Sequence, residues 1–226
     1  MDRAALLAEW PLLGSIAPAD ADELLARARS RRFARGEAVF HEHDPADTLH
    51  LIRKGRFAIQ LNLFGERAIL TILGPGDSFG ELALIDDNAH RSATVVALEP
   101  GQTLSIHVHD FDRMRERKPE LERMVSALLA SQVRRLSAQL AEALYLPVDV
   151  RIRRRLHAVL SQYGGTAEAA AVPLTQQTLA ELAGTTRQAV NKVLREDEAK
   201  GIVELRRGAV VVHDPEALAR RAKLTS

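Results

Sequence analysis

The 226-residue chain contains no cysteine, which excludes disulfides, cysteine-ligated metal sites and a cysteine nucleophile. Aromatic residues are scarce, at 4% of the chain, so we do not expect binding by stacking on a series of nucleic-acid bases. No apolar run reaches the ~18 residues that span a bilayer. The first ten residues carry acids and lack the apolar core of a secretory signal. We therefore expect a soluble, cytoplasmic protein without a membrane partner.

Charge is unevenly distributed along the chain. From Val148 to the end there are 13 Lys and Arg against 9 Asp and Glu, whereas the preceding part has 18 against 21. A chain of this length is expected to form one or two domains. The asymmetry favours two modules, the second of which faces an anion such as nucleic acid. The alternative is a chance difference.

The first half of the chain has the sequence pattern of a β-protein. A short helix is predicted from Pro18, and after Arg31 short β-rich runs alternate with turns that contain glycine or proline. The predicted strands are Ala38–Phe40, Leu49–Ile52, Phe57–Leu61, Ala68–Leu73, Ala93–Leu98 and Gln102–Ile106. Many short strands with a turn signal about every ten residues indicate a β-sandwich or barrel.

A long helix is predicted from about Pro119 to Leu146, because this stretch has no glycine and no interior proline. Its apolar residues step by four and three along the sequence, which predicts a heptad seam that pairs with a second helix. The seam consists of Leu129, Val133, Leu136, Leu140 and Ala143. The alternative is a helix packed on its own barrel. Pro147 ends the helix and marks a boundary.

The last third is predicted to be helical and then to end in a hairpin. A helix over residues 150–163 ends at two glycines, and a linker of small residues follows over 166–172. Residues 174–195 predict two helices joined by a turn at Gly184, with Thr175 capping the first helix and Thr185 the second. Residues 202–205 and 209–212 predict a two-stranded wing.

One group of residues has the chemistry of an anion site. Gly80 precedes a predicted helical turn, which lets backbone N–H groups approach a phosphate closely. Arg91 can direct two hydrogen bonds to phosphate oxygens, and Ser92 can donate a third. Glu81 is unexpected beside an anion unless its carboxylate accepts a sugar hydroxyl. The alternative is a surface loop with an Arg–Glu pair.

These residues resemble the phosphate-binding cassette of the CRP/FNR family of bacterial transcription factors, since Gly80, Glu81 and Leu82 are followed at the family spacing by Arg91, Ser92 and Ala93. The resemblance covers essentially the whole chain. It implies an α+β protein with a cyclic-nucleotide-binding β-barrel of the jelly-roll type (residues 1–118), a dimerisation helix (119–147) and a winged helix-turn-helix domain (148–226). It also implies cyclic AMP as the effector, with the Glu on the ribose hydroxyl and the Arg and Ser on the cyclic phosphate. The implied partners are near-palindromic double-stranded DNA, a second copy of the chain and RNA polymerase.

The chain departs from the family pattern at two places. His90 stands where a proline or polar residue usually precedes the Arg. Leu136 and Ser137 align with two hydroxyl residues that contact the adenine, and a leucine cannot make that hydrogen bond. We therefore keep open the alternative that the regulator responds to a different effector, or to none.

The second predicted helix of the helix-turn-helix has two contrasting faces. Ala189, Val190, Val193 and Leu194 are predicted to pack inward. The opposite face carries groups suited to base edges and phosphates in a DNA groove. The predicted DNA-binding residues are Thr186, Arg187, Gln188, Asn191, Lys192 and Arg195. The alternative is a solvated helix face.

Residues at the start of this helix predict its base preference, and arginines elsewhere in the last third of the chain are candidates for phosphate contacts. The family commonly has Arg-Glu where this chain has Arg187 and Gln188, which predicts an altered base pair opposite Gln188. Several arginines are candidates for phosphate contacts, although each has the alternative of pairing with Asp149 or Glu204. These arginines are Arg153, Arg154, Arg155, Arg206 and Arg207.

Four histidines raise a different possibility. His41 and His43, and likewise His107 and His109, alternate as residues on one face of a strand do. Two such pairs suggest a metal site, or a metal-dependent barrel enzyme, but no third ligand is defined. We therefore expect no metal site, no catalytic residue and no enzymatic activity.

Overall fold

The computed structural model describes residues 10–85, 90–164 and 169–224. The chain forms two compact units, which are described here one at a time. The first contains residues 1–61 and 72–136, and the second contains residues 62–71 and 137–226. Among the described residues, no helix has both the length and the apolar composition needed to cross a membrane.

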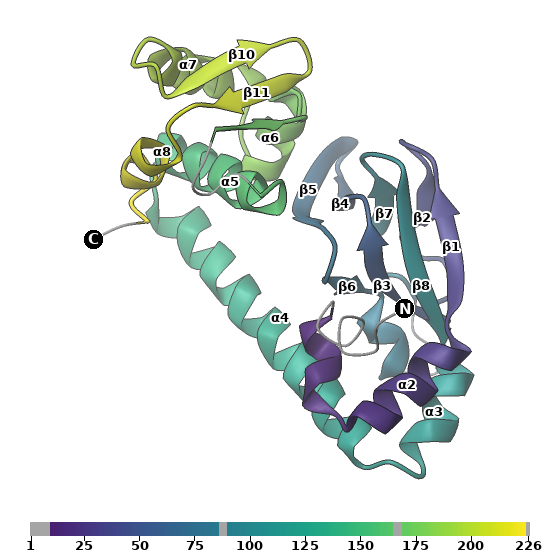
Figure 1. The fold of residues 1–226 in the computed structure, drawn as a ribbon. Coiled ribbons are helices and arrows are strands. Elements are labelled where there is room, and N and C mark those ends of the chain that lie inside the picture. Colours follow the sequence, from purple (N-terminus) through teal and green to yellow (C-terminus); the bar gives the residue numbers. More distant parts are fainter. Residues whose placement is uncertain (1–9, 86–89, 165–168, 225–226) are drawn as a thin grey trace. The chain divides into compact units, whose positions relative to one another are not determined.

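Two four-stranded sheets pack face to face in a jelly-roll-like sandwich (Figure 1). One sheet has the order β1-β8-β3-β6 and the other β2-β7-β4-β5. The strands are β1 (Arg29–Phe33), β2 (Ala38–Phe40), β3 (Thr48–Lys54), β4 (Phe57–Leu63), β5 (Glu66–Leu73), β6 (Ser78–Phe79), β7 (Thr94–Ala97) and β8 (Gly101–His107). The predicted α+β class is confirmed, with open sheets rather than a closed barrel.

The six predicted strands are all present, but the sequence did not indicate β1 and β6. Strand β1 reads Arg-Ser-Arg-Arg-Phe, and only Phe33 of it is buried. It therefore lacks the alternation of apolar and polar residues that marks a half-buried strand. Strand β6 has two residues and pairs with β3 at the edge of its sheet. Both strands are defined by backbone pairing with partners distant in sequence.

A core of seven buried side chains joins the two sheets and lies directly beneath the predicted cassette. The members are Phe33, Ile52, Phe57, Leu73, Phe79, Val95 and Ala97. Phe79 is the residue before Gly80, so burial of its ring fixes where the cassette begins. Full burial of one aromatic or large aliphatic side chain contributes about 1.5–3 kcal/mol.

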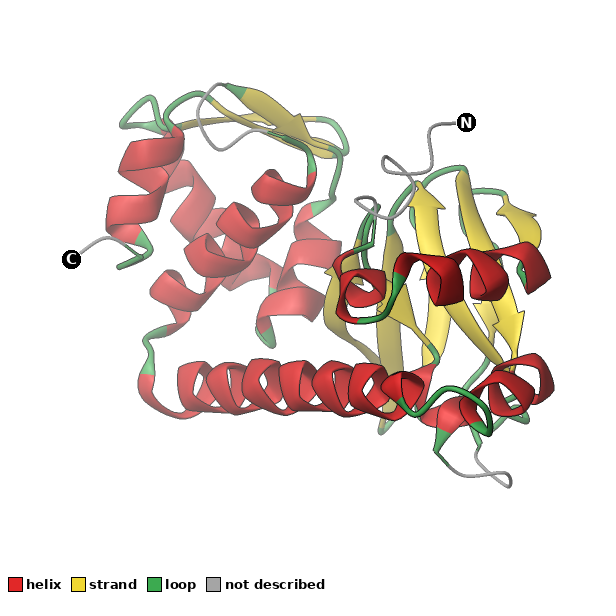
Figure 2. Ribbon diagram, turned by 60° about the horizontal axis from the view of Figure 1, so that its bottom comes forward, coloured by secondary structure: helices red, strands yellow, loops and turns green. Residues whose placement is uncertain are grey.

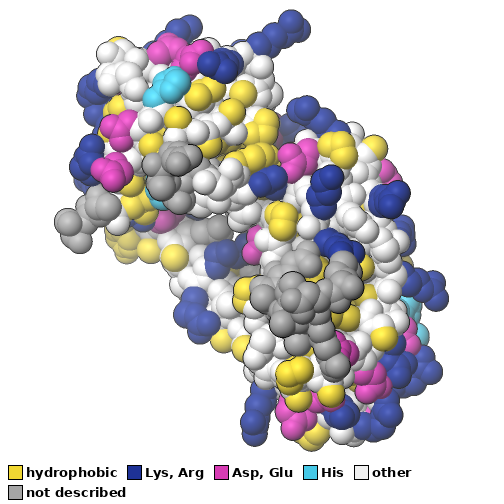
Figure 3. Space-filling view, viewed as in Figure 1, with side chains coloured by type: hydrophobic (Ala, Val, Ile, Leu, Met, Phe, Trp, Pro, Cys, Tyr) yellow, Lys and Arg dark blue, Asp and Glu magenta, His cyan; other side chains and the backbone are white. Residues whose placement is uncertain are grey.

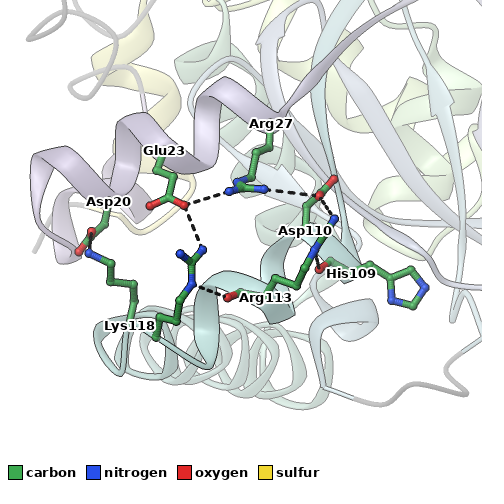
Figure 4. Close-up of polar contacts among 8 residues, drawn as sticks. Asp20, Glu23, Arg27, His109, Asp110, Arg113 and Lys118 are labelled. Atoms are coloured by element: carbon green, nitrogen blue, oxygen red, sulfur yellow. Dashed lines mark hydrogen bonds and ion pairs between the residues drawn. The ribbon is translucent and has the colours of Figure 1, made fainter.

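Three helical segments pack beside the sandwich: η1 (Pro11–Ser15), α2 (Pro18–Arg27) and α3 (Val108–Arg115). Figure 4 shows polar contacts that join α2 to α3 and to the turn after it, with Lys118 on Asp20 and Arg27 between Glu23 and Asp110. Asp20 is buried, but its partner Lys118 and the other side chains are partly exposed, so the contacts chiefly fix orientation. The buried Trp10 donates its indole N–H to the carbonyl of Ile52 at 2.9 Å, which ties this layer to β3.

Helix α4 (Glu120–Tyr145) is a single unbroken helix, as predicted (Figure 2). Its first two turns bury Leu121, Met124, Val125 and Leu128. Leu129, predicted to begin the seam, is partly buried against the core of its own unit. The large aliphatic side chains after it lie exposed within one chain, and they include Leu144, which the predicted seam did not contain. The exposed fractions are 62% for Val133, 53% for Leu136, 60% for Leu140 and 65% for Leu144. We call these four residues the α4 stripe. An exposed apolar row of this length is typical of an interaction surface.

The second unit packs four helices against a three-stranded sheet (Figure 2). Its elements are α5 (Val148–Gln162), β9 (Ala170–Val172), α6 (Gln176–Ala183), α7 (Arg187–Glu198), β10 (Val203–Arg206), β11 (Ala209–Val212) and α8 (Pro215–Arg221). The predicted helix-turn-helix is present as α6 and α7.

Three details of this unit correct the sequence analysis. Residues 170–172, expected to belong to a linker, form β9, so the wing has three strands in the order β10-β11-β9; residues 165–168 lie outside the described part. The chain ends in helix α8 rather than in the hairpin. The cap of α7 is Thr186, whose hydroxyl accepts the N–H of Ala189 at 3.2 Å, and not Thr185. The helix begins one residue later than expected.

The turn between α6 and α7 is built as predicted around Gly184. This residue adopts the left-handed conformation, with φ +59° and ψ +51°. A Cβ there would meet no atom within 4 Å. The requirement for glycine is therefore conformational rather than steric.

A buried ion cluster holds the second unit together. Asp197 on α7 is fully buried, and it accepts three hydrogen bonds from Arg153 on α5 at 2.9–3.3 Å. Arg221 on α8 approaches the same carboxylate at 2.8 Å. Arg153 is itself 2% exposed and also pairs with Asp149 at 2.7 Å. One carboxylate thus joins three helices.

Candidate functional site

Gly80 lies at a point where no side chain fits. It adopts a left-handed conformation (φ +84°), which L-residues rarely adopt. A Cβ at this position would lie 2.7 Å from the carbonyl oxygen of Thr48 and 2.8 Å from Nη1 of Arg91. The short turn η2 (Glu81–Leu84) begins directly after it, as expected from the sequence. Glycine therefore lets the backbone approach Arg91 closely.

Arg91 is clamped from one side by the start of β3. It is 4% exposed, and its Nη1 donates to the carbonyl oxygen of Thr48 at 2.8 Å. Its Nη2 donates to the hydroxyl of Thr48 at 2.8 Å and to Asp47 at 3.2 Å. The guanidinium carbon lies 4.0 Å from the centre of the Phe40 ring. These contacts fix the plane and direction of the guanidinium.

Arg91 is a buried cation, and one of its donor atoms, Nε, is not used in these contacts. Burial lowers its pKa, and the carboxylate of Asp47 opposes that shift. The group remains a cation, because arginine is not deprotonated in proteins. Its Nε is buried and has no hydrogen-bond partner among the residues that the structure describes. An unsatisfied buried donor on a cation is costly unless an acceptor is supplied, and an anion would supply one.

A pocket opens beside this cation in the first unit. Its empty space is about 490 Å³, a figure that includes open solvent at its mouth. The five predicted cassette residues all line it: Gly80, Glu81, Leu82, Arg91 and Ser92. His90 lines it too, whereas residues 86–89 of the intervening loop lie outside the described part. Apolar walls come from Phe40, Ile59, Leu73 and Val95.

Helix α4 contributes different residues from those expected. Among the described residues of one chain, the α4 side chains that line the pocket are Gln132 and Arg135, which hydrogen-bond to each other. Leu136 is in the α4 stripe, more than half exposed, and Ser137 is also exposed. Burial lowers the pKa of Arg135, and the nearby Glu81 carboxylate opposes that shift. A second cation thus lines the pocket.

The outward face of α7 carries most of the predicted DNA-binding side chains. Arg187, Gln188 and Lys192 are exposed, whereas Val190, Val193 and Leu194 are buried beneath them. Ala189, predicted to pack inward, is only partly buried. A groove on the same unit is lined by Arg187 and Asn191 of α7, by Gln176 and Gln177 of α6, and by the wing residues 205–210. The helix-turn-helix and the wing therefore share one surface.

Three of the predicted contacts have partners within the chain. The Asn191 amide donates to Gln176 on α6 at 3.1 Å. Arg195 pairs with Glu198 at 2.7 Å on the helix surface. The Thr186 hydroxyl caps α7. Exposed ion pairs such as the Arg195 pair are weak and exchange readily for phosphate contacts.

Most of the arginines proposed for phosphate contacts are engaged elsewhere. Arg153 is buried in the ion cluster, which corrects that prediction. Arg154 and Arg155 pair with Glu142 at 2.9 and 3.0 Å, and Arg206 pairs with Glu204 at 2.8 Å. On the visible face, basic side chains of the second unit alternate with acidic ones (Figure 3). Arg207 on the wing is exposed and lines the groove.

The histidine pairs do not form the alternating strand pattern. His41 and His43 lie in the turn after β2, and His43 has a positive φ of 71°. His107 ends β8, while His109 belongs to α3, and their rings stack at 5.1 Å. Within the described residues no group of three or more potential metal ligands is found.

Comparisons with known proteins match two domain families along the chain. The profile of the "Cyclic nucleotide-binding domain" matches residues 30–118, and that of the "Crp-like helix-turn-helix domain" matches residues 122–221. The "CRP-like cAMP-activated global transcriptional regulator" of Mycobacterium tuberculosis is 32% identical over 96% of this chain and 99% of that protein. The "Cyclic AMP receptor protein" of Thermus thermophilus is 31% identical over 90% of this chain and 93% of that protein.

Solved structures show the same fold. A transcriptional regulator of the CRP family from Thermus thermophilus has a TM-score of 0.70 at 27% identity, covering 85% of this chain and 96% of that one. The c-di-GMP responsive global regulator CLP from Xanthomonas campestris has a TM-score of 0.74 at 21% identity, covering 87% and 99%. The profile matches, the two relatives above 30% identity and the paired sites lead to one conclusion: the chain belongs to the CRP family of cyclic-nucleotide-binding, helix-turn-helix transcriptional regulators.

Proposed function

We propose that the protein is a homodimeric regulator in the cytoplasm whose DNA binding is controlled by cyclic AMP. The observation that carries the proposal is Arg91, a buried cation with an unused Nε donor in a pocket that also presents Ser92 and Glu81. Arg91 and Ser92 hold the cyclic phosphate, and Glu81 accepts a ribose hydroxyl. The relatives named for cyclic AMP support this choice of nucleotide.

The effector works by shifting a population of conformations. It activates the protein only to the extent that it binds the DNA-competent arrangement more tightly than the other. That arrangement presents two α7 helices about one turn of DNA apart, ~34 Å, to a near-palindromic site. RNA polymerase is the proposed partner at the promoter.

Calorimetric titration of the ligand-stripped protein with cyclic AMP and then with cyclic GMP tests the effector. We expect saturable binding near one nucleotide per chain, with cyclic AMP the tighter ligand. Absence of heat and of competition with either nucleotide would contradict the proposal. A second candidate, a regulator with a different effector or none, is favoured by Leu136. It predicts operator binding that cyclic AMP does not change.

Dimerisation through the α4 stripe predicts a large effect of one charged substitution. Leu140→Asp places a carboxylate on each side of an apolar seam, and burial of unpaired charges is costly. We expect the dimer dissociation constant to rise at least about tenfold, as measured by sedimentation. Ala138→Asp is the control, because Ala138 is exposed on a different face of the same helix. Equal sedimentation of both variants would contradict the assigned seam.

The DNA-binding face predicts a sequence-specific role for Arg187. Arg187→Ala is expected to weaken binding to the selected operator by about 1–3 kcal/mol and to relax preference at one base pair. The measurement is a binding titration on the operator and on random DNA. Arg220→Ala on α8 serves as the control, since Arg220 is an exposed arginine outside the groove. An equal loss of affinity for operator and random DNA would show that Arg187 contacts a phosphate and does not read a base.

A further inference from the structure

A buried histidine lies behind the arginine clamp. His50 in β3 is 3% exposed, and its ring is stacked on Phe79 with centres 5.0 Å apart and planes 5° apart. Its Nδ1 lies 3.0 Å from the hydroxyl of Thr103 in β8. Its Nε2 lies 3.2 Å from the hydroxyl of Thr48. Both ring nitrogens therefore have a hydroxyl partner.

The contacts of the Thr48 hydroxyl define the direction of each hydrogen bond. This oxygen accepts from Nη2 of Arg91 at 2.8 Å and donates its single proton to Asp47 at 3.0 Å. The remaining contact must then run from Nε2–H of His50 to Thr48. Burial first, and the nearby Arg91 second, lower the pKa of His50 to about 3, so the ring is neutral near pH 7. In a neutral ring whose Nε2 carries the hydrogen, Nδ1 accepts from the hydroxyl of Thr103.

The result is one continuous chain of hydrogen bonds that ends at the pocket. It runs from Thr103 through His50 and Thr48 to Arg91. The residue that stacks on His50, Phe79, directly precedes Gly80. His50 thus contacts the supports of two parts of the candidate site, the Arg91 guanidinium through Thr48 and the glycine turn through Phe79.

We propose that His50 is a positioning residue, which orients the Thr48 hydroxyl and thereby holds the guanidinium of Arg91 in one fixed direction beside the pocket. This inference rests on the proposed function, because a fixed guanidinium direction matters for binding only if Arg91 holds the anionic phosphate of the ligand. A ligand phosphate then meets a donor whose direction is already set, which reduces the ordering cost of binding. The alternative is that His50 only fills the core.

The test compares four variants of the full chain. His50→Phe keeps an aromatic ring for stacking on Phe79 and removes both nitrogens, whereas His50→Gln retains a donor that reaches toward Thr48. Thr48→Val removes the hydroxyl, and the fourth variant combines His50→Phe with Thr48→Val. His41→Phe is the control, since His41 is exposed in a turn. Cyclic AMP affinity and the thermal midpoint are measured for each variant.

If His50 acts through Thr48, its effects cannot add to those of Thr48. We expect His50→Phe to weaken cyclic AMP binding about three- to tenfold, the effect of losing one hydrogen bond. His50→Gln recovers most of that loss, and the double variant binds no more weakly than Thr48→Val alone. Additive losses in the double variant would overturn the proposal.

A measurement without ligand separates this proposal from the proposed function. In protein with ¹⁵N-labelled arginine, the Nε–H resonance of Arg91 is assigned by its absence from Arg91→Lys. We expect this resonance to shift and its solvent exchange to quicken in His50→Phe and Thr48→Val, but not in His41→Phe. An unchanged resonance in folded His50→Phe would make His50 a core residue only. If the natural chain binds neither cyclic AMP nor cyclic GMP, the proposed function fails, while the resonance still decides the role of His50.

Discussion

Arg91→Ala is expected to weaken cyclic-nucleotide binding at least about 100-fold. The substitution removes the buried cation and its unused Nε donor, and one hydrogen bond between charged groups, at about 3 kcal/mol, corresponds to roughly that ratio. Arg91→Lys keeps a positive charge but loses the planar fork, so we expect an intermediate loss. Calorimetric titration with cyclic AMP measures both variants.

Two measurements distinguish a loss of nucleotide binding in Arg91→Ala from a loss of folding. The thermal midpoint shows whether Arg91→Ala remains folded, since the substitution also removes one hydrogen-bond partner from Asp47 and from Thr48. Arg32→Ala on β1 is the matched control, because Arg32 is an exposed arginine of the same unit that does not line the pocket. Affinity equal to that of the natural chain in a folded Arg91→Ala protein would remove the phosphate role.

Asp197→Ala is expected to destabilise the second unit by about 3–5 kcal/mol, the range for breaking a buried ion pair by removing one partner. The substitution leaves Arg153 buried with only its outer partners, Asp149 and Glu196, and it separates α7 from α5 and α8. A loss of this size is a large fraction of the stability of a small domain. Operator binding should fall with it, because α7 is no longer held in place.

Chemical denaturation followed by circular dichroism measures the Asp197→Ala effect. Asp197→Asn keeps the shape and the acceptor oxygen but removes the charge, so it should lose less stability than the alanine variant. Glu216→Ala removes an exposed carboxylate from α8 and serves as the control, with no measurable change expected. A loss below about 1 kcal/mol in Asp197→Ala would show that the cluster does not hold the three helices together.

The local parts of both sites were predictable from the sequence. The cassette glycine and Arg91 lie within twelve positions of each other, and the two faces of α7 follow the helical period. The residues that hold them were not predictable in this way. Thr48 lies 43 positions before Arg91, and Gln176 lies 15 before Asn191. Nothing in the sequence marks such pairs, because the fold alone brings them together.

The errors of the sequence analysis have the same origin. Arg153 resembles a phosphate-binding residue in sequence, and only its contact with Asp197, 44 positions away, shows that it is structural. The adjacent threonines 185 and 186 are equally good caps, so the helix start could not be fixed to one residue. Gln132 and Arg135 stand one turn apart on α4 beside the apolar seam, and a polar pair at that spacing is common on solvated helices.

The exposed α4 stripe has a consequence for gene dosage. If the operator-competent species is a dimer and most chains are monomers, mass action makes its concentration rise with the square of the amount of protein. A twofold change in expression then changes the competent species about fourfold at a constant level of nucleotide. The amount of regulator in the cell thereby becomes a second input beside the effector, and an autoregulated promoter would respond to it steeply.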